Sequence, residues 1–392
     1  MARDVVIVGA ARTPVGSFLG SLSSLTAPQL GSVAIRAALE RSGVSPDQVN
    51  ETWMGCVLQA GVGQAPARQA SIGAGIPDSV PTNTLNKVCG SGLKAIISGA
   101  QAIALEDADV VVAGGMESMS NAPYLSHSMR QGARMGSVEF KDAMILDGLW
   151  DVYSQQHMGN CAELCATQFG ITREAQDAFA LASTQQAIRS QKEGLFKAEI
   201  ISVSVPQKRG DPLVVSEDEG PKNARPEKIS GLKPVFKKDG TVTAANASSL
   251  NDGAAAVVLM SADRAKAEGR TVLARIAGYA SAARKPVEFT IAPADAIRKL
   301  LEKVQKRTED VELWEINEAF AVVSLANNQL LKLDASKVNV RGGAVALGHP
   351  IGASGARLLV TLLYAMKDLN KKRGVVSLCI GGGEGIALMV ER

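Results

Sequence analysis

The sequence predicts an α/β fold of two duplicated halves packed in layers, with a long loop domain inserted in the first half. Two observations lead to this prediction. Apolar β-branched runs alternate with segments of helical periodicity along the chain, which is typical of a buried, largely parallel sheet covered by helices. The same order of signals also occurs twice, as expected of an internal repeat. At 392 residues the chain is long enough for more than one core.

The first half begins with a strand signal followed by a helical segment. Residues 5–8 are a β-branched run, and residues 28–41 place small and aliphatic side chains on one helical face. Apolar positions follow Cys89 at helical spacing, so we expect a helix to start beside this cysteine. A further apolar run covers residues 109–113 and ends at Gly114-Gly115, where we expect the strand to stop.

The second half repeats these signals in the same order. Trp53 precedes Cys89 by 36 residues, and Trp314 precedes His349 by 35 residues. A helical signal follows both Cys89 and His349 and leads in each case to an apolar strand. If the halves pair about a pseudo-twofold axis, the loops of Cys89 and His349 are equivalent, and we expect them to face one shared site.

An irregular segment interrupts the first half. Residues 120–249 mix Gly, Pro, Met and charged residues without a clear period, and a strand signal returns at residues 254–260. We therefore expect three units. Residues 1–119 with 250–271 form the first half, residues 120–249 form the inserted loop domain, and residues 272–392 form the second half.

Composition and charge argue against several classes of protein. The net charge is +3, with basic and acidic residues mixed along the chain, whereas nucleic-acid binding usually needs a clustered basic face. No segment reaches the roughly 18 apolar residues of a membrane span, and the N-terminus lacks the layout of a signal peptide. We therefore expect a cytoplasmic protein with neither a nucleic-acid partner nor a membrane partner.

The five cysteines indicate free thiols. An odd number of cysteines without a secretion signal argues against a disulfide framework. Only Cys161 and Cys165 are close in sequence, and no two of the three histidines have the spacing of metal ligands. We therefore expect no metal site.

Cys89 is a candidate nucleophile. It stands in the segment Asn-Lys-Val-Cys-Gly-Ser-Gly-Leu-Lys, residues 86–94, at the predicted start of a helix. Unpaired N–H groups and the positive end of the helix dipole favour the thiolate there, and the flanking glycines allow a ligand to approach closely. An inert buried cysteine is the alternative that this segment alone leaves open.

Three more segments hold candidate groups. His349 lies among small residues just before a helix, where a hydrogen-bonded structural histidine is the alternative. Cys379 ends an apolar strand and is followed by Gly381 and two further glycines. Their N–H groups suit an oxyanion hole, although a flexible turn is the alternative. Asn317 stands at a strand-to-helix corner, where it can also be a simple cap. Too few residues follow the glycines to build a dinucleotide-binding unit.

Together the four segments closely resemble the thiolase family over essentially the whole chain. The segments are Cys89, Asn-Glu-Ala-Phe at Asn317, Gly-His-Pro at His349 and Cys-Ile-Gly-Gly-Gly at Cys379. They occur in the family's order and approximate spacing. The resemblance implies the thiolase fold.

Within the family the chain looks most like the acetyl-CoA acetyltransferases, because of Gln-His-Met-Gly at 156–159 and Ala-Asn-Ala-Ser at 245–248. This implies condensation of two acetyl-CoA to acetoacetyl-CoA plus CoA, and the reverse thiolysis, in fatty acid and lipid metabolism. The CoA thioesters are substrates, and no cofactor is expected. Potassium-activated relatives carry a Tyr in the insertion, but none occurs here between Tyr153 and Tyr279. Residues 126–136 resemble the family's tetramerisation loop, which implies a homotetramer built from dimers.

The resemblance also implies a role for each residue. Cys89 attacks the thioester and carries the acyl group, while His349 takes the thiol proton. Asn317 orients a water in an oxyanion hole with His349, and the N–H groups of Cys89 and Gly381 form a second hole. Cys379 removes a proton from the second acetyl-CoA. The residues implied to contact CoA or to narrow the acyl pocket are Ser248, His157 and Met158.

Three other interpretations stay open. A 3-ketoacyl-CoA thiolase of broader chain length uses the same groups. A β-ketoacyl synthase-like condensing enzyme normally pairs its cysteine with two histidines or with His and Asn, and the second thiol at Cys379 argues against it. A catalytically inactive, thiolase-like binding protein is disfavoured because all four candidate groups are present.

Overall fold

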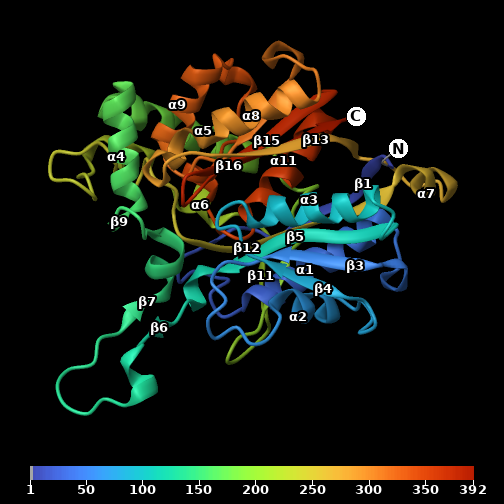
Figure 1. The fold of residues 1–392 in the computed structure, drawn as a ribbon, viewed down its shortest axis with the longest axis horizontal. Coiled ribbons are helices and arrows are strands. Elements are labelled where there is room, and N and C mark those ends of the chain that lie inside the picture. Colours follow the sequence, from blue (N-terminus) through green and yellow to red (C-terminus); the bar gives the residue numbers. More distant parts are fainter. Residues whose placement is uncertain (1–2) are drawn as a thin grey trace.

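One long mixed sheet runs through the computed structural model, which describes residues 3–392 (Figure 1). Its strands are β1 (Val5–Arg12), β2 (Gly16–Ser17), β3 (Glu51–Gly55), β4 (Thr82–Leu85), β5 (Val110–Ser118), β12 (Asn251–Ser261), β13 (Ala274–Ala283), β14 (Leu313–Ile316), β15 (Arg373–Ile380) and β16 (Glu384–Glu391). They follow the order β14-β15-β16-β13-β1-β12-β5-β3-β4, and β2 pairs with β12.

The sheet has the same strand pattern on either side of the contact between β1 and β13. In the first half β12 lies antiparallel between β1 and β5, and β5 is parallel to β3. In the second half β16 lies antiparallel between β13 and β15, and β15 is parallel to β14. A short antiparallel pairing of β1 with β13 joins the halves. The predicted α/β alternation is confirmed.

The expectation of a largely parallel sheet is wrong. Only the pairs β3–β4, β3–β5 and β14–β15 are parallel among the described strands of this sheet. The chain returns from the insertion along β12, against the direction of both neighbours, and a tight glycine turn sends β16 back beside β15. Apolar runs do not reveal strand direction, because buried strands of either direction have the same composition.

Helices pack on both halves of the sheet, and two of them, central in the molecule, contact strands of both halves. They are α1 (Ala27–Ser42), α2 (Pro66–Gly73), α3 (Ser91–Ala104), α4 (Met158–Phe169), α5 (Arg173–Lys192), α6 (Glu219–Asn223), α7 (Ala262–Ala267), α8 (Ala292–Lys303), α9 (Ala321–Leu331), α10 (Ala344–Leu347) and α11 (Ser354–Asp368). The central core joins α3 and α11 with strands of both halves. Helix α1 packs on the outside of the first half and α8 on the outside of the second.

Local sequence explains where α1 begins and ends. The Thr26 hydroxyl accepts from the Gln29 N–H, and the Gln29 side chain accepts from the Thr26 N–H, which satisfies two otherwise unpaired donors. Gly43 ends the helix at φ 66°, in the left-handed region that glycine adopts without strain. Between these caps, Leu30 and Ala34 are fully buried and face the sheet.

Gly114 and Gly115 lie inside β5 and do not end it, contrary to the sequence prediction. A Cβ on Gly114 would be 2.1 Å from the Ala255 carbonyl oxygen, and one on Gly115 would be 2.1 Å from the Gly352 carbonyl oxygen. The glycines are therefore required by close approach of neighbouring backbone. This approach brings the loop that follows His349 directly against β5.

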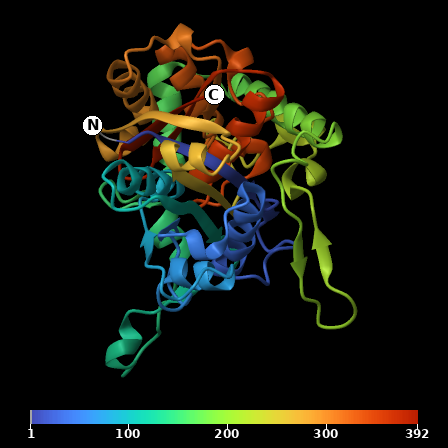
Figure 2. The same ribbon diagram turned by 90° about the vertical axis from the view of Figure 1, so that its right-hand side faces the viewer.

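The insertion contains regular structure as well as loops. Helices α4 and α5 lie in it, with the hairpins β6–β7, β8–β9 and β10–β11. The hairpin strands are β6 (Tyr124–Leu125), β7 (Lys141–Asp142), β8 (Trp150–Asp151), β9 (Gln156–His157), β10 (Val203–Val205) and β11 (Leu213–Val215). The segment between β6 and β7 projects from the body as an arm, and the β10–β11 hairpin extends along another side (Figure 2).

A buried ion-pair cluster attaches the insertion to the sheet. Arg12 of β1 donates to Glu199 at 2.6 Å and to Asp218 at 2.8 Å, and all three side chains are fully buried. Removing one partner from such a cluster leaves a buried charge unpaired, which is strongly destabilising.

Within residues 3–392, no helix is both long and apolar enough to cross a membrane.

Candidate active site

Three loops from the two halves border one cavity of about 450 Å³. Cys89 lies just before α3, His349 lies in the loop before α11, and Gly381 follows β15. All three residues line the cavity. The structure therefore brings the equivalent loops of the two halves to one space.

The two central helices begin against each other beside this cavity. A Cβ on Gly92 would be 3.0 Å from the Gly352 carbonyl oxygen, and one on Gly355 would be 2.6 Å from the Leu93 nitrogen. Only glycine permits this approach. It holds the positive ends of two helix dipoles near one site, where they favour negative charge.

Cys89 sits in a tight turn that its neighbours hold. Val88 has φ 46°, and the Ser91 hydroxyl donates to the Val88 carbonyl at 2.6 Å and accepts from the Lys87 N–H at 2.8 Å. Burial raises the pKa of the Cys89 thiol to about 11, although the N–H groups of Gly381 and of Cys89 itself act in the opposite direction. Because those two N–H groups act on the sulfur, they are also placed to donate to the oxygen of an acyl group carried by Cys89.

His349 is held on both ring nitrogens. Its Nδ1 lies 2.6 Å from the Ser354 hydroxyl, and its Nε2 lies 3.4 Å from the Asn317 side-chain nitrogen. The Asn251 side-chain oxygen also accepts from the His349 N–H at 2.9 Å. Burial, with a contribution from Arg357, lowers the pKa of the imidazole to about 3. The ring is therefore neutral at physiological pH.

The Ser354 hydroxyl can serve either tautomer of His349. It also lies 2.9 Å from the Pro350 carbonyl oxygen. With its proton directed at Pro350, Ser354 accepts from Nδ1–H and leaves the Nε2 lone pair free. With its proton directed at Nδ1, the ring carries its own proton on Nε2. One serine thus supports His349 both as a proton acceptor and as a donor.

Asn317 follows β14 and is not a helix cap. Helix α9 begins later, with Phe320 in the N-cap position. The Asn317 N–H donates to the Ser377 carbonyl at 3.0 Å, which fixes the residue to the neighbouring strand. Its side chain is fully buried, and its Oδ1 has no hydrogen-bond partner among the described residues. Asn317 lies behind the cavity wall and contacts it through His349.

Cys379 is a fully buried thiol at the end of β15. Burial raises its pKa well above the ordinary value, and the nearby Cys89 raises it further. Cys379 packs with Met158 and Phe320, at the inner side of the cavity.

The opposite wall comes from the insertion. Ser248, His157 and Met158 all line the cavity. His157 caps α4 by accepting from the Gly159 N–H at 3.1 Å, and its ring stacks on Phe236 with centroids 4.7 Å apart. Burial lowers the pKa of His157. The sequence-predicted residues are therefore divided between the lining and a second layer, which contains Asn317 and Cys379.

Sequence analysis missed several residues that hold this site. Asn251 anchors the His349 backbone, Phe236 supports His157, and Glu117 accepts from three backbone N–H groups around Cys89. The available signal was a polar residue at the end of a buried strand, as at Glu117 in β5 and Asn251 in β12. Phe236 carried no such signal, because it lies in an irregular segment.

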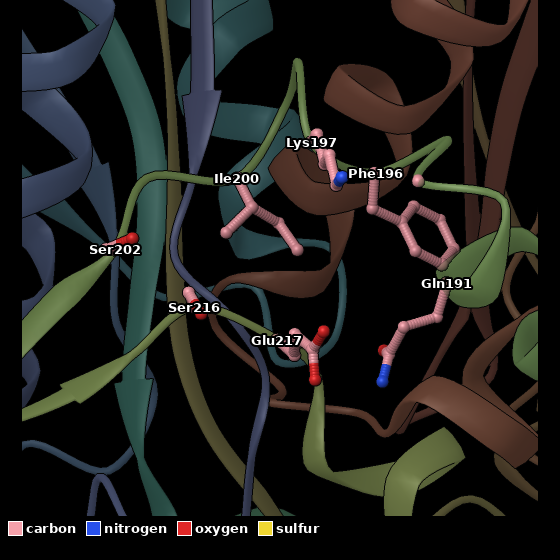
Figure 3. A pocket seen from close by; sticks show the side chains of 8 residues that line it. Gln191, Phe196, Lys197, Ile200, Ser202, Ser216 and Glu217 are labelled. Atoms are coloured by element: carbon pink, nitrogen blue, oxygen red, sulfur yellow. The ribbon is translucent and has the colours of Figure 1, made fainter.

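A second hollow of about 210 Å³ lies away from these groups, and all of its lining residues belong to the insertion (Figure 3). Lys197 and Glu217 line it beside Phe196, and it contains no thiol or imidazole. No group of three possible metal ligands occurs among residues 3–392. The candidate nucleophile Cys89 and the imidazole of His349 therefore lie together in the cavity of about 450 Å³.

The fold and the cavity define an acyl-transfer enzyme with a cysteine nucleophile. A thiol at a helix start, a neutral imidazole and two convergent N–H groups are the parts that this chemistry needs. The chain belongs to the thiolase family. The thiolase N-terminal domain matches residues 5–263, and the thiolase C-terminal domain matches residues 270–392.

Named relatives are similar over their whole length. The chain is 57% identical over 390 residues to an acetyl-CoA acetyltransferase of Cupriavidus necator, covering 99% of each chain. It is 56% identical over 391 residues to one of Pseudomonas aeruginosa, covering 100% of each. The crystal structure of the Bacillus anthracis acetyl-CoA acetyltransferase superposes with a TM-score of 0.97 at 44% identity, covering 100% of this chain and 99% of that one.

Proposed function

We propose that this chain is an acetyl-CoA C-acetyltransferase. It condenses two acetyl-CoA to acetoacetyl-CoA and CoA, and catalyses the reverse thiolysis, through an acetyl-Cys89 intermediate. The observation that carries the proposal is the convergence of the Cys89 thiol, the Gly381 N–H and His349 on one cavity, with the thiol of Cys379 close to Cys89. Relatives of more than half identical sequence bear the same activity in their names.

In the first half-reaction the Cys89 sulfur attacks the thioester carbon of acetyl-CoA. His349 Nε2 accepts the thiol proton during the attack, because a neutral ring and a protonated thiol are the stable forms in the empty site. The developing oxyanion accepts from the N–H groups of Cys89 and Gly381. When the C–S bond to CoA breaks, the imidazolium returns the proton to the CoA sulfur.

In the second half-reaction Cys379 releases its thiol proton to solvent and then, as thiolate, removes a proton from the methyl group of another acetyl-CoA. Acetylation leaves Cys89 without charge, so the contribution of Cys89 to the raised Cys379 pKa is absent in the acetyl-enzyme. The enolate oxygen accepts from the Nε2–H tautomer of His349 and from a water held by Asn317. The enolate carbon bonds to the acetyl carbon, the bond to the Cys89 sulfur breaks, and Cys379 passes the methyl proton to that sulfur. Cys379 then takes up a proton from solvent and returns to its resting thiol form.

The cavity also supports short acyl substrates. Its volume is within the ordinary range for small-molecule sites, and its lining beside Cys89 includes Met144, Leu149 and Met158. Ser248 and His157 lie on the same wall and are proposed to contact the CoA thioester. No cofactor, metal or potassium ion takes part in the proposed reaction.

Acetylation followed by product analysis tests the function. The purified chain is mixed with acetyl-CoA alone, and the protein is examined by intact mass and peptide mapping. We expect one acetyl group on Cys89 and acetoacetyl-CoA in solution, with Cys89→Ala as the inactive control. Absence of both, in a folded preparation that binds CoA, refutes the proposal.

We further propose a cytoplasmic homotetramer built from dimers. All five cysteines are free, and the chemistry needs two of them reduced, which suits a reducing compartment. The projecting arm carries exposed apolar side chains, with Met135 fully exposed and Met129 53% exposed. Such side chains on a projecting segment suit burial against other subunits. Light scattering that gives a monomer at micromolar concentration contradicts the assembly, and cell fractionation tests the compartment.

A further inference from the structure

Glu117 is a buried carboxylate for which the proposed reaction has no step. It stands near the end of β5 and is fully buried. Its Oε2 accepts from the Val57 N–H at 3.1 Å and the Gly352 N–H at 2.9 Å, and its Oε1 accepts from the Leu58 N–H at 3.2 Å. The Cys56 thiol lies 3.8 Å from Oε1. One side chain therefore binds two loops that belong to different halves of the molecule.

These two loops support an apolar wall beside the nucleophile. Val57, Leu58 and Ile351 pack with Met119 and Met144 in one cluster, and Cys89 contacts that cluster. Ile351 also lines the cavity, and it directly precedes Gly352. The backbone positions that Glu117 fixes are thus those that carry Leu58 and Ile351 toward the wall.

Leu58 and Ile351 meet at a glycine of the insertion that lines the same cavity. A Cβ on Gly148 would be 3.1 Å from the Ile351 Cδ1 and 3.6 Å from the Leu58 Cδ2. Ile351 is therefore part of the cavity surface beside Gly148, while Leu58 supports Gly148 from behind. Outward movement of Ile351 adds space to the cavity directly, and outward movement of Leu58 removes the support that keeps Gly148 in place.

A carboxylate at this place disfavours the thiolate of Cys89, because its negative charge raises the pKa of the Cys89 thiol. Burial also raises the pKa of Glu117 to about 7, while its N–H donors oppose that rise. A carboxamide would remove the charge but cannot replace the geometry. It has one acceptor oxygen, and its NH₂ group would face either the Leu58 N–H or the N–H groups of Val57 and Gly352.

We propose that Glu117 is a positioning residue that sets acyl-chain length, by holding residues 57–58 and 351–352 so that Leu58 and Ile351 close the cavity beside Cys89. The inference rests on the proposed function, since it concerns the acyl group carried by Cys89. Glu117 touches neither the acyl group nor CoA, and it acts through the two loops.

Thiolysis of two substrates by Glu117→Gln tests this role. The values of kcat/KM are measured for acetoacetyl-CoA and for 3-ketohexanoyl-CoA, with CoA as the second substrate. Loosening the wall admits the longer chain, so the ratio of the longer to the shorter substrate is expected to rise at least about tenfold. A merely structural defect lowers both values by the same factor and leaves the ratio unchanged, and that result overturns the inference.

Glu163→Gln is the matched control. Glu163 is also a buried carboxylate that accepts backbone N–H groups, from Thr241 at 2.8 Å and Val242 at 2.8 Å. Residues 57–58 and 351–352 are not among its hydrogen-bond partners. The substrate ratio of Glu163→Gln is expected to equal that of the wild type, and a rise like that of Glu117→Gln also counts against the inference.

Two further measurements keep the test decisive. If Glu117→Gln does not fold, Glu117→Asp replaces it, because aspartate keeps both acceptor oxygens but shortens their reach, and the same rise in ratio is expected. Leu58→Ala removes the side chain that supports Gly148 and must also raise the ratio. A wild-type enzyme that cannot cleave acetoacetyl-CoA refutes the proposed function itself, whereas an active wild type with an unchanged Glu117→Gln ratio refutes only the role of Glu117.

Discussion

Replacing Ser354 with alanine isolates one hydrogen bond of the catalytic imidazole. The hydroxyl lies 2.6 Å from His349 Nδ1, and it supports both tautomers that the proposed mechanism uses. The change leaves the rest of the turn intact, because the Pro350 carbonyl still accepts from the N–H groups of Ala353 at 2.9 Å and residue 354 at 3.0 Å. Alanine is also favourable in a helix.

The expected loss follows from the charge on the ring during acylation. His349 becomes an imidazolium as it takes the Cys89 proton, and a hydrogen bond to a charged group contributes about 1.5–3 kcal/mol. Acetylation of Cys89 should therefore slow by about 10- to 150-fold. Because the pKa of the neutral ring is already lowered by burial and by Arg357, little else in the site stabilises the imidazolium.

Rapid quenching after mixing with acetyl-CoA, followed by intact mass, gives the acetylation rate. Ser32→Ala is the control, because Ser32 is a helical serine that donates to the Pro28 carbonyl at 2.9 Å and lies in the outer layer. Its acetylation rate should equal that of the wild type. A folded Ser354→Ala enzyme that acetylates Cys89 at the wild-type rate refutes the reasoning.

Cys379→Ser should leave acetylation of Cys89 in place and lower acetoacetyl-CoA formation by about 10²- to 10⁴-fold; loss of the acetyl adduct contradicts the separation of the two thiols. Thiolysis of 3-ketodecanoyl-CoA should be far slower than that of acetoacetyl-CoA, since each excluded methylene forfeits about 0.8 kcal/mol of burial; comparable kcat/KM values argue against a short-chain pocket. Burial raises the pKa of Cys89 to about 11, so its thiolate fraction grows with pH throughout the neutral range. Alkylation of Cys89 by iodoacetamide should therefore keep accelerating as the solution becomes alkaline, and a plateau near neutral pH contradicts the proton-bearing thiol.

Two opposite electrostatic effects act on the cavity beside Cys89. The nucleophile is favoured by positive potential from two helix starts, whereas the wall behind it is held by a negative carboxylate. The three N–H bonds of Glu117 partly neutralise that charge. The carboxylate that holds the two loops of the wall therefore also raises the pKa of the Cys89 thiol.

The sequence by itself determined the order of elements and the identity of the loop-borne groups. Periodicity located the strand that becomes β1 and the helix that becomes α1, because burial on one face leaves a regular spacing of apolar residues. Cys89 and His349 were found because small residues surround them at the start of a helical signal. Each of those patterns depends only on residues that are close together in the sequence.

Only the tertiary structure decided strand direction, the place of Gly114-Gly115 and the support of the site. The two glycines lie within β5 because the backbones of Ala255 and Gly352 pass too close for a side chain. Glu117 accepts from donors 60 and 235 residues away along the chain, and Asn251 holds His349 across 98 residues. Contacts of that separation leave no periodic signal, because they depend on which strands and loops become neighbours when the two halves close on each other.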